Sequence, residues 1–249
     1  MDWQDSGIIL SLARHGEHDA VLEVLTAEHG RHRGFVKAGM SRRQKGHLQP
    51  GSRVEVSWYS RLEEGLGRFT VEPVHNPLGA LMGDGARLAA LSAMVSVVAA
   101  TLPEREPHGR VYEGLVALLD LLEDDASALV HWGEGLVRLE LGVLADLGYG
   151  LDLSECAATG DNDNLTYVSP KSGRAVSASA GAPYAERLLV LPPFLIDTAA
   201  GRPSLREVAN GLALTGFFLG RNVWDVQGQG QPPARERFTA TLAAEISRG

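Results

Sequence analysis

RVEVSWY, residues 53–59, alternates apolar and polar side chains from end to end. Val54, Val56 and Trp58 share one face of an extended chain, and polar or amphipathic side chains share the other. GRFTVEPV, residues 67–74, repeats the pattern, with Phe69 and Val71 in the apolar phase. A period of two is typical of a strand with one buried and one solvated face. The two segments therefore predict strands that cover a core.

Three more apolar segments precede this pair. They read GIILSLAR, AVLEVLT and RHRGFVKA, and turn signals at Glu28-His29-Gly30 and Pro50-Gly51 separate the segments. Five short strands within residues 7–75 predict a small closed β-barrel of the OB type. Strand faces and loops of this architecture commonly bind oligonucleotides.

Helical periodicity replaces the strand pattern after Asn76-Pro77. Apolar side chains recur at helical spacing in the segments 78–101, 111–122, 127–147, 204–219 and 234–247, and Gly148 is a suitable helix C-cap. Residues 149–182 interrupt the helices with a Gly-, Ser- and Asp-rich segment, in which 165–168 and 174–177 predict a small hairpin. We therefore predict an α+β chain with an OB-type barrel over residues 1–77. A mainly helical domain over residues 78–249, with the hairpin as an insert, follows it.

Positive charge is concentrated in one part of an acidic chain. The 249 residues hold 31 Asp+Glu against 23 Lys+Arg, a net charge of −8. Residues 29–53 nevertheless contain seven Lys/Arg and no carboxylate. Such segregation suits a polyanion site, because a field of one sign steers phosphates. A solvated loop that is basic by chance is the alternative interpretation.

The basic segment spans the third predicted strand and the loop that leads to the fourth. Trp58 and Phe69 are in phase with the core, which leaves Tyr59 as the better partner for stacking on a base. The predicted DNA-binding residues are Arg31, Arg33, Lys37, Arg42, Arg43, Lys45, Arg53 and Tyr59.

The composition predicts a soluble protein of the cytoplasm. The amino-terminal sequence MDWQDSGIIL has no basic region ahead of an apolar run, and the longest nearly apolar segment, 88–100, is too short to cross a bilayer. The single cysteine, Cys156, excludes an internal disulfide and fits a reducing compartment.

No catalytic or metal motif is complete. The pairs His15/His18 and His29/His32 lack accompanying ligands, and we interpret them as polar turn residues. An EF-hand counted from Asp161 would place Thr166 where the sharp turn needs glycine. The tetrapeptide PKSG lacks the upstream glycine of a P-loop, and no serine lies in a Gly-x-Ser-x-Gly elbow. The sequence therefore predicts no enzyme, metal or cofactor.

The order of these parts resembles the bacterial RecO recombination-mediator family over nearly the whole chain. The resemblance rests on SGIILSLARHGEHDAVLEVLTAEHGRHRGFVKAGMSRR near the amino terminus, LADLGYGLDLSECAATG and YVSPKSGRAVS in the middle, and LTGFFLGRNV near the end. It implies an OB domain followed by a helical domain with an inserted knuckle, which agrees with the residue patterns.

The resemblance also implies a function and partners. It implies a non-enzymatic DNA repair protein at the nucleoid that binds single- and double-stranded DNA and anneals complementary strands. Its implied partners are RecR, the C-terminal tail of the single-stranded-DNA-binding protein SSB and, indirectly, RecA. An acidic tail with apolar terminal residues needs an apolar pocket with a cation at its rim. Arg138 and Arg221 in the helical domain are the predicted cations.

One departure from the family concerns zinc. Zinc-bearing members carry two Cys-x-x-Cys pairs around the hairpin, whereas this chain has Cys156, Thr159, Ser177 and Ala180 at the matching positions. One thiolate does not hold a structural zinc, so we expect a small buried side chain at Cys156.

Two functions of other classes remain open. The basic barrel also suits a protein-interaction scaffold that contacts an acidic partner, and competition with non-cognate DNA separates the two readings. A hydrolase that uses Cys156 is a more distant alternative, which Cys156→Ala tests.

Overall fold

The computed structural model describes residues 1–62, 65–197 and 201–248. The chain forms two compact units, Met1–Asp125 and Ala126–Gly249. No helix in the described part of the chain combines the length and apolarity needed to cross a membrane.

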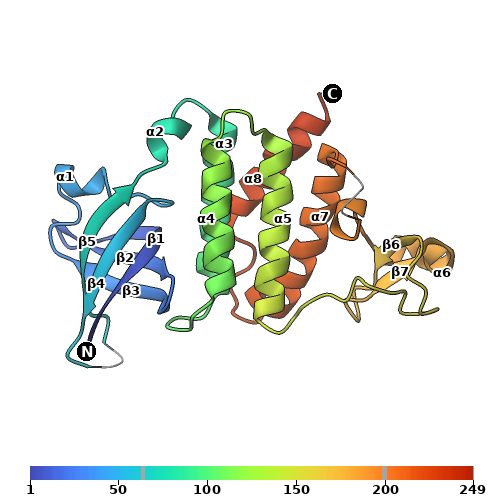
Figure 1. Cartoon of the computed structure of the whole chain (residues 1–249), viewed down its shortest axis with the longest axis horizontal. Coiled ribbons are helices and arrows are strands. Elements are labelled where there is room, and N and C mark those ends of the chain that lie inside the picture. Colours follow the sequence, from blue (N-terminus) through green and yellow to red (C-terminus); the bar gives the residue numbers. More distant parts are fainter. Residues whose placement is uncertain (63–64, 198–200, 249) are drawn as a thin grey trace. The chain divides into compact units, whose positions relative to one another are not determined.

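Five strands open the first unit and close into a barrel in the order β1-β2-β3-β5-β4 (Figure 1). Their bounds are β1 (Asp2–His15), β2 (Asp19–Thr26), β3 (Gly30–Val36), β4 (Arg53–Tyr59) and β5 (Arg68–His75). Neighbouring strands run antiparallel, except β3 and β5, which pair in parallel through Phe35 and Arg68. This confirms the predicted five-stranded barrel at the amino terminus.

The side chains that point inward from the strands fill the barrel. Trp58 and Phe69 are 3% and 2% exposed, as the alternation in β4 and β5 predicted. The other members of this cluster are Ile9, Leu22, Val24, Val36, Leu48, Val54 and Val56. Gly34 is required on β3, because a Cβ there would lie 2.4 Å from the Phe69 ring.

Two elements of the barrel differ from the sequence prediction. β1 begins at Asp2 instead of residue 7, because residues 2–8 pair with β4 in register from Asp2 opposite Tyr59 to Ile8 opposite Arg53. The loop after β3 contains a helical turn, α1 (Arg42–Lys45), which starts where Ser41 Oγ accepts the Gln44 N–H at 3.4 Å.

Three helices complete the first unit, namely α2 (Leu78–Leu81), α3 (Gly85–Thr101) and α4 (Gly109–Glu123). The predicted helix over 78–101 is thus interrupted near Gly83, whose φ is +102°. α3 restarts with Asp84, whose side chain accepts the N–H groups of Ala86 and Arg87. β1 packs against α3, and Ile8 and Leu10 are buried outside the barrel-core cluster. The middle of β1, residues 7–10, is therefore buried on both faces.

The second unit is a helical bundle with a small sheet. Its main helices are α5 (Leu129–Asp146), α7 (Leu205–Leu219), the π-helical turn η3 (Gly220–Trp224) and α8 (Pro233–Ile246). The sheet has the order β7-β6-β8, formed by β6 (Leu165–Val168), β7 (Ala175–Ser177) and β8 (Leu189–Val190). Short turns α6 (Ala178–Gly181), η1 (Ala182–Arg187) and η2 (Pro193–Leu195) accompany it. The predicted hairpin is present, and Gly148 ends α5 with a φ of +81°.

A buried ion pair joins the helices of the second unit. Arg235 of α8 donates to both carboxylate oxygens of Glu140 on α5, from Nε at 2.6 Å and from Nη2 at 2.8 Å. Thr215 of α7 also donates to this carboxylate. Arg235 is 2% exposed and Glu140 is fully buried, so both charges are removed from water. The two parallel hydrogen bonds between them offset this cost of desolvation.

Strands end and helices begin at the predicted boundary near residue 77. The compact first unit nevertheless includes α2, α3 and α4 together with the barrel. That residues 1–77 form a domain of their own, without these helices, stays a prediction.

Candidate nucleic-acid interface

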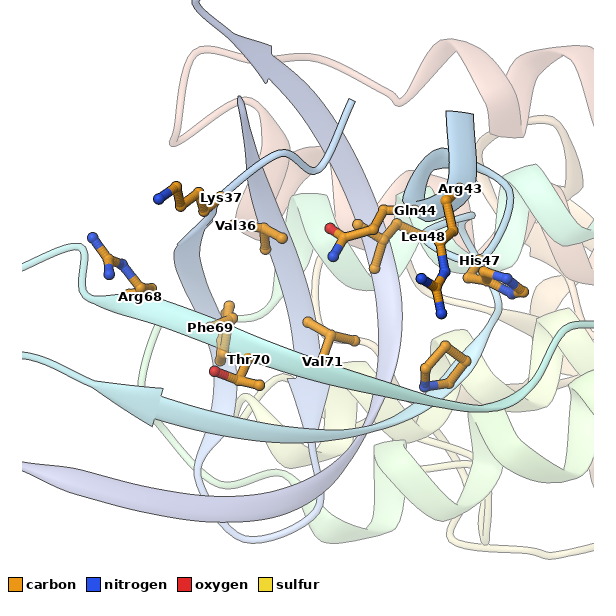
Figure 2. A pocket seen from close by; sticks show the side chains of 11 residues that line it. Val36, Lys37, Arg43, Gln44, His47, Leu48, Arg68, Phe69, Thr70 and Val71 are labelled. Atoms are coloured by element: carbon orange, nitrogen blue, oxygen red, sulfur yellow. The ribbon is translucent and has the colours of Figure 1, made fainter. Parts of the chain in front are cut away.

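A cleft of about 580 Å³ opens beside β5, between the end of β3 and the α1 turn. We call it the basic cleft. Its lining residues are Val36, Lys37, Arg43, Gln44, His47, Leu48, Arg68, Phe69, Thr70, Val71 and Pro73. In Figure 2, Lys37 and Arg68 lie toward one end, and Arg43 and His47 lie toward the other. The floor is apolar and the rim is cationic, and the lining residues that the structure describes include no carboxylate.

Local hydrogen bonds position the cationic rim. The Ala38 N–H donates to Asp19 Oδ1 at 2.7 Å, and the Met40 N–H donates to the His18 carbonyl at 2.9 Å. Asn76 Nδ2 donates to the Gly46 carbonyl at 2.9 Å. The loop with Lys37 and Arg43 is therefore tied to the turn between β1 and β2 and to the end of β5.

Lys37, Arg43 and Arg68 are exposed, and no described residue forms an ion pair with any of them. Arg42 and Lys45 on α1 share this property but do not line the cleft. Because no ion pair with a described residue has to be broken, these cations can contact a phosphate without that energetic cost. The cleft is thus the part of the predicted basic segment that is ready to bind an anion.

The other three predicted arginines are engaged within the first unit. Arg31 forms an ion pair with Glu23 and donates from Nε to the Leu102 carbonyl at 2.8 Å. Arg33 pairs with Glu104, and Arg53 pairs with Asp120 on α4. The structure therefore divides the predicted set into arginines with an ion-pair partner and cations without one among the described residues.

Arg68 was missed by the sequence interpretation. It lies outside the basic segment, and it reaches the cleft because β5 pairs with β3 at Phe35. The sequence offered one signal for Arg68. It directly precedes Phe69, which points inward, so its own side chain was expected to point outward.

Tyr59 of β4 lies directly opposite Arg68 of β5, in a second hollow on the outer face of the barrel. Its side chain is 56% exposed, which leaves a ring face open to solvent. Trp58, its neighbour in the chain, points inward and donates from Nε1 to the Leu66 carbonyl at 3.1 Å. The inward position predicted for Trp58 from its phase is confirmed, and stacking of a base on Tyr59 stays a prediction.

The interpretation of His29 and His32 as polar turn residues holds for His29, which lies in the turn between β2 and β3, and was wrong for His32, which is buried on β3. His32 is 6% exposed, and its ring centroid lies 4.9 Å from that of Trp3. Burial, followed by the positive charge of Arg105, lowers the pKa of His32 to about 4. His29 stacks on Trp3 at 4.3 Å and contacts Asp5 Oδ2 at 2.9 Å. Both rings are structural, whereas His15 and His18 are exposed as expected.

Arg138 and Arg221 lie in the second unit, each over an aromatic ring. Arg138 donates to the Phe194 carbonyl at 2.9 Å and pairs with Glu134. Its guanidinium lies 5.6 Å from the centroid of the Phe194 ring. Arg221 donates to the Pro170 carbonyl and lies 5.4 Å from the Phe218 ring. Both arginine side chains are exposed, whereas the rings that they cover, Phe194 and Phe218, are buried.

The residues at the zinc-knuckle positions do not fit zinc. Cys156 is 1% exposed, lies 3.5 Å from Ser177 Oγ and accepts the Ser177 N–H at 3.3 Å. Hydrogen bonds from Ser177 and Thr159 lower the pKa of the thiol to about 6. One sulfur with neutral hydroxyls is a poor donor set for this metal. In the described part of the chain, no three His, Cys, Asp or Glu side chains cluster as metal ligands.

Comparisons with known proteins cover both units. The family model "Recombination protein O N terminal" matches residues 1–77, and "Recombination protein O C terminal" matches residues 82–223. The chain is 50% identical over 249 residues to the DNA repair protein RecO of Methylobacterium nodulans, covering 98% of this chain and 99% of the relative. It is 44% identical over 247 residues to the protein of the same name from Brucella abortus, covering 99% and 98%. For the Methylocella silvestris protein, also named DNA repair protein RecO, the identity is 44% over 249 residues, covering 100% and 98%.

Proposed function

The chain belongs to the RecO family of DNA repair proteins, and on that premise we propose that it binds DNA through the basic cleft and anneals complementary strands. In this proposal it is a mediator of recombinational repair without an enzymatic step of its own. It acts at the nucleoid on both single- and double-stranded DNA.

The observation that carries the proposal is the set of exposed cations at the basic cleft that have no ion-pair partner in the described part of the chain. Lys37, Arg43 and Arg68 offer positive charge without an ion pair to a described residue, and none of the described residues that line the cleft is a carboxylate. Contacts of this kind grip the phosphate backbone and do not read the sequence. Annealing needs such contacts, because the base edges must stay available for pairing.

The helical unit is the proposed site for partners. Arg138 and Arg221 each offer an exposed guanidinium held over a buried aromatic ring, which suits the acidic part of such a peptide. We assign this surface to the SSB tail. Binding there, together with RecR, would place the protein on SSB-coated strands and assist RecA loading.

Annealing of SSB-coated complementary oligonucleotides tests the proposal. The wild-type protein should accelerate annealing, and K37A/R43A/R68A should lose most of this effect. The matched control K171A/R206A/R237A removes three exposed cations from the second unit and should retain it. Equal rates with and without the wild-type protein would contradict the proposal. Failure of non-cognate DNA to compete for the barrel would favour an acidic protein partner instead.

A further inference from the structure

A second hollow of about 340 Å³ lies on the outer face of the barrel, on the other side of β5 from the basic cleft. We call it the outer pocket. Strand register places its outward side chains in two rows across β1, β4 and β5. The rows are Asp2, Tyr59 and Arg68, and Gln4, Ser57 and Thr70.

The chemistry of the outer pocket differs from that of the basic cleft. Tyr59 offers an open aromatic face, and Trp3 and Trp58 add apolar surface below it. Gln4, Ser57 and Thr70 supply neutral donors and acceptors. The carboxylate of Asp2 repels a phosphate from this end and accepts hydrogen bonds from amino groups. These groups together suit a flat, uncharged ring with polar edges.

Arg68 and Thr70 line both hollows, so the outer pocket and the basic cleft meet along β5. A ligand that reaches both must carry an anionic group beside a neutral planar group. A nucleotide unit has this composition, because its phosphate and its base are adjacent.

We infer that the outer pocket receives an unpaired base of a single DNA strand whose phosphates occupy the basic cleft, with Arg68 at the junction. The inference rests on the proposed function and adds a base site to it. Stacking on Tyr59 is indifferent to base identity, since every base has a π face. Paired bases in a duplex are stacked between their neighbours and cannot enter the pocket. The protein therefore holds single strands more tightly than the duplex that annealing produces, which favours release of the product.

The test compares two fluorescent oligonucleotides of equal length, one with normal bases and one with abasic residues throughout. Both present the same phosphates, so their difference in affinity reports base contacts. The full-length wild-type protein should bind the normal strand at least roughly tenfold more tightly. Tyr59→Ala should bring the ratio close to one, and Tyr59→Phe should keep it. Quenching of tryptophan fluorescence by the normal strand alone provides a second readout, because Trp3 and Trp58 line the pocket.

Tyr184→Ala is the matched control, since this tyrosine of the second unit is 60% exposed against 56% for Tyr59. It should leave the ratio unchanged. Equal wild-type affinity for both strands would overturn the base site while the phosphate-binding proposal stands. A high ratio that survives Tyr59→Ala would also overturn it, because the bases would then bind elsewhere. Binding of neither strand would refute both the base site and the proposed function.

Discussion

Arg33 Nε lies 2.7 Å from Glu104 Oε1. This pair links β3 to the segment after α3, and Arg31 donates beside it to the Leu102 carbonyl. The acid-free basic segment of the sequence is therefore partly neutralised by carboxylates from elsewhere in the first unit. The free cations at the cleft and the partnered arginines should respond differently to mutation.

Removal of the cleft cations should reduce the salt dependence of DNA binding. Each phosphate contact on a single strand contributes about 0.7 to the slope of log affinity against log salt. K37A/R43A/R68A should therefore lower the slope by about 2, and K171A/R206A/R237A should leave it unchanged. Fluorescence anisotropy between 50 and 200 mM salt measures this. An unchanged slope in the cleft variant would place the phosphates elsewhere.

Removal of a partnered arginine should affect stability more than binding. The Arg31 side chain is only 16% exposed. It forms an ion pair with Glu23 and donates a hydrogen bond to the Leu102 carbonyl. Arg31→Ala should lower the free energy of unfolding by about 2 kcal/mol, because hydrogen bonds to charged groups are lost. Arg42→Ala, which removes an exposed cation, should change it by less than about 0.5 kcal/mol. Urea denaturation compares the two. A stable Arg31→Ala protein with a reduced salt slope would show that Arg31 contacts DNA.

Burial of neutral His32 should make the fold sensitive to acid. Its pKa is about 4 in the folded chain against an ordinary value of 6.5, so between these values only the unfolded chain takes up the proton. The stability that neutral His32 contributes to the fold is fully present above pH 6.5 and is lost as the pH falls toward 4. The loss between pH 7 and 4.5 should be about 2 kcal/mol.

Urea denaturation at both pH values measures the effect of His32. His32→Phe should show a smaller acid-induced loss than wild type, whereas His18→Gln, at an exposed position, should behave as wild type. An identical pH dependence in His32→Phe would assign the acid sensitivity to other groups.

Zinc content should be far below one per chain in protein purified without chelators, because Cys156 is the one thiol in the sequence. T159C/S177C/A180C should gain one zinc, since Cys156 already lies beside Ser177 in the hairpin. The same triple variant with Cys156→Ser should bind it more weakly. Elemental analysis after dialysis decides the outcome, and stoichiometric zinc in the wild type would reveal ligands of another kind.

Truncation should show how far the barrel depends on its helices. Ile8 and Leu10 of β1 are buried outside the barrel core, and β1 packs against α3. A fragment of residues 1–77 exposes this face and should be markedly less stable than a fragment of residues 1–125. Thermal unfolding followed by circular dichroism compares the fragments. Equal stability would favour an independent barrel domain that ends at residue 77.

The sequence predicted the strands well where alternation reports burial directly. Trp58 and Phe69 were assigned to the core from their phase, and they lie there. The start of β1 was missed because Asp2, Gln4 and Asp5 are polar, and only pairing with β4 makes this segment extended. α1 was missed for a related reason, since Arg42–Lys45 has no apolar face to signal a helix.

The candidate site was less accessible to sequence reasoning. A run of basic residues identifies the segment but does not show which side chains meet carboxylates from distant elements. Glu104 and Asp120 lie far along the chain from their partners Arg33 and Arg53. Arg68 joins the cleft through strand pairing alone. Burial of His32 likewise depends on Trp3, which belongs to the unpredicted start of β1.

The barrel closes between β3 and β5 at one register pair in the described residues, Phe35 and Arg68, whereas β1 and β2 share eight. Local opening of a protein starts where few backbone hydrogen bonds resist it. Amide hydrogen exchange should therefore be fastest along this seam and slow in β1 and β2. Because the seam borders the basic cleft, a ligand in the cleft would hold its two edges together. Protection of the β3 and β5 amides on DNA binding would then report occupancy residue by residue, without a fluorophore on either molecule.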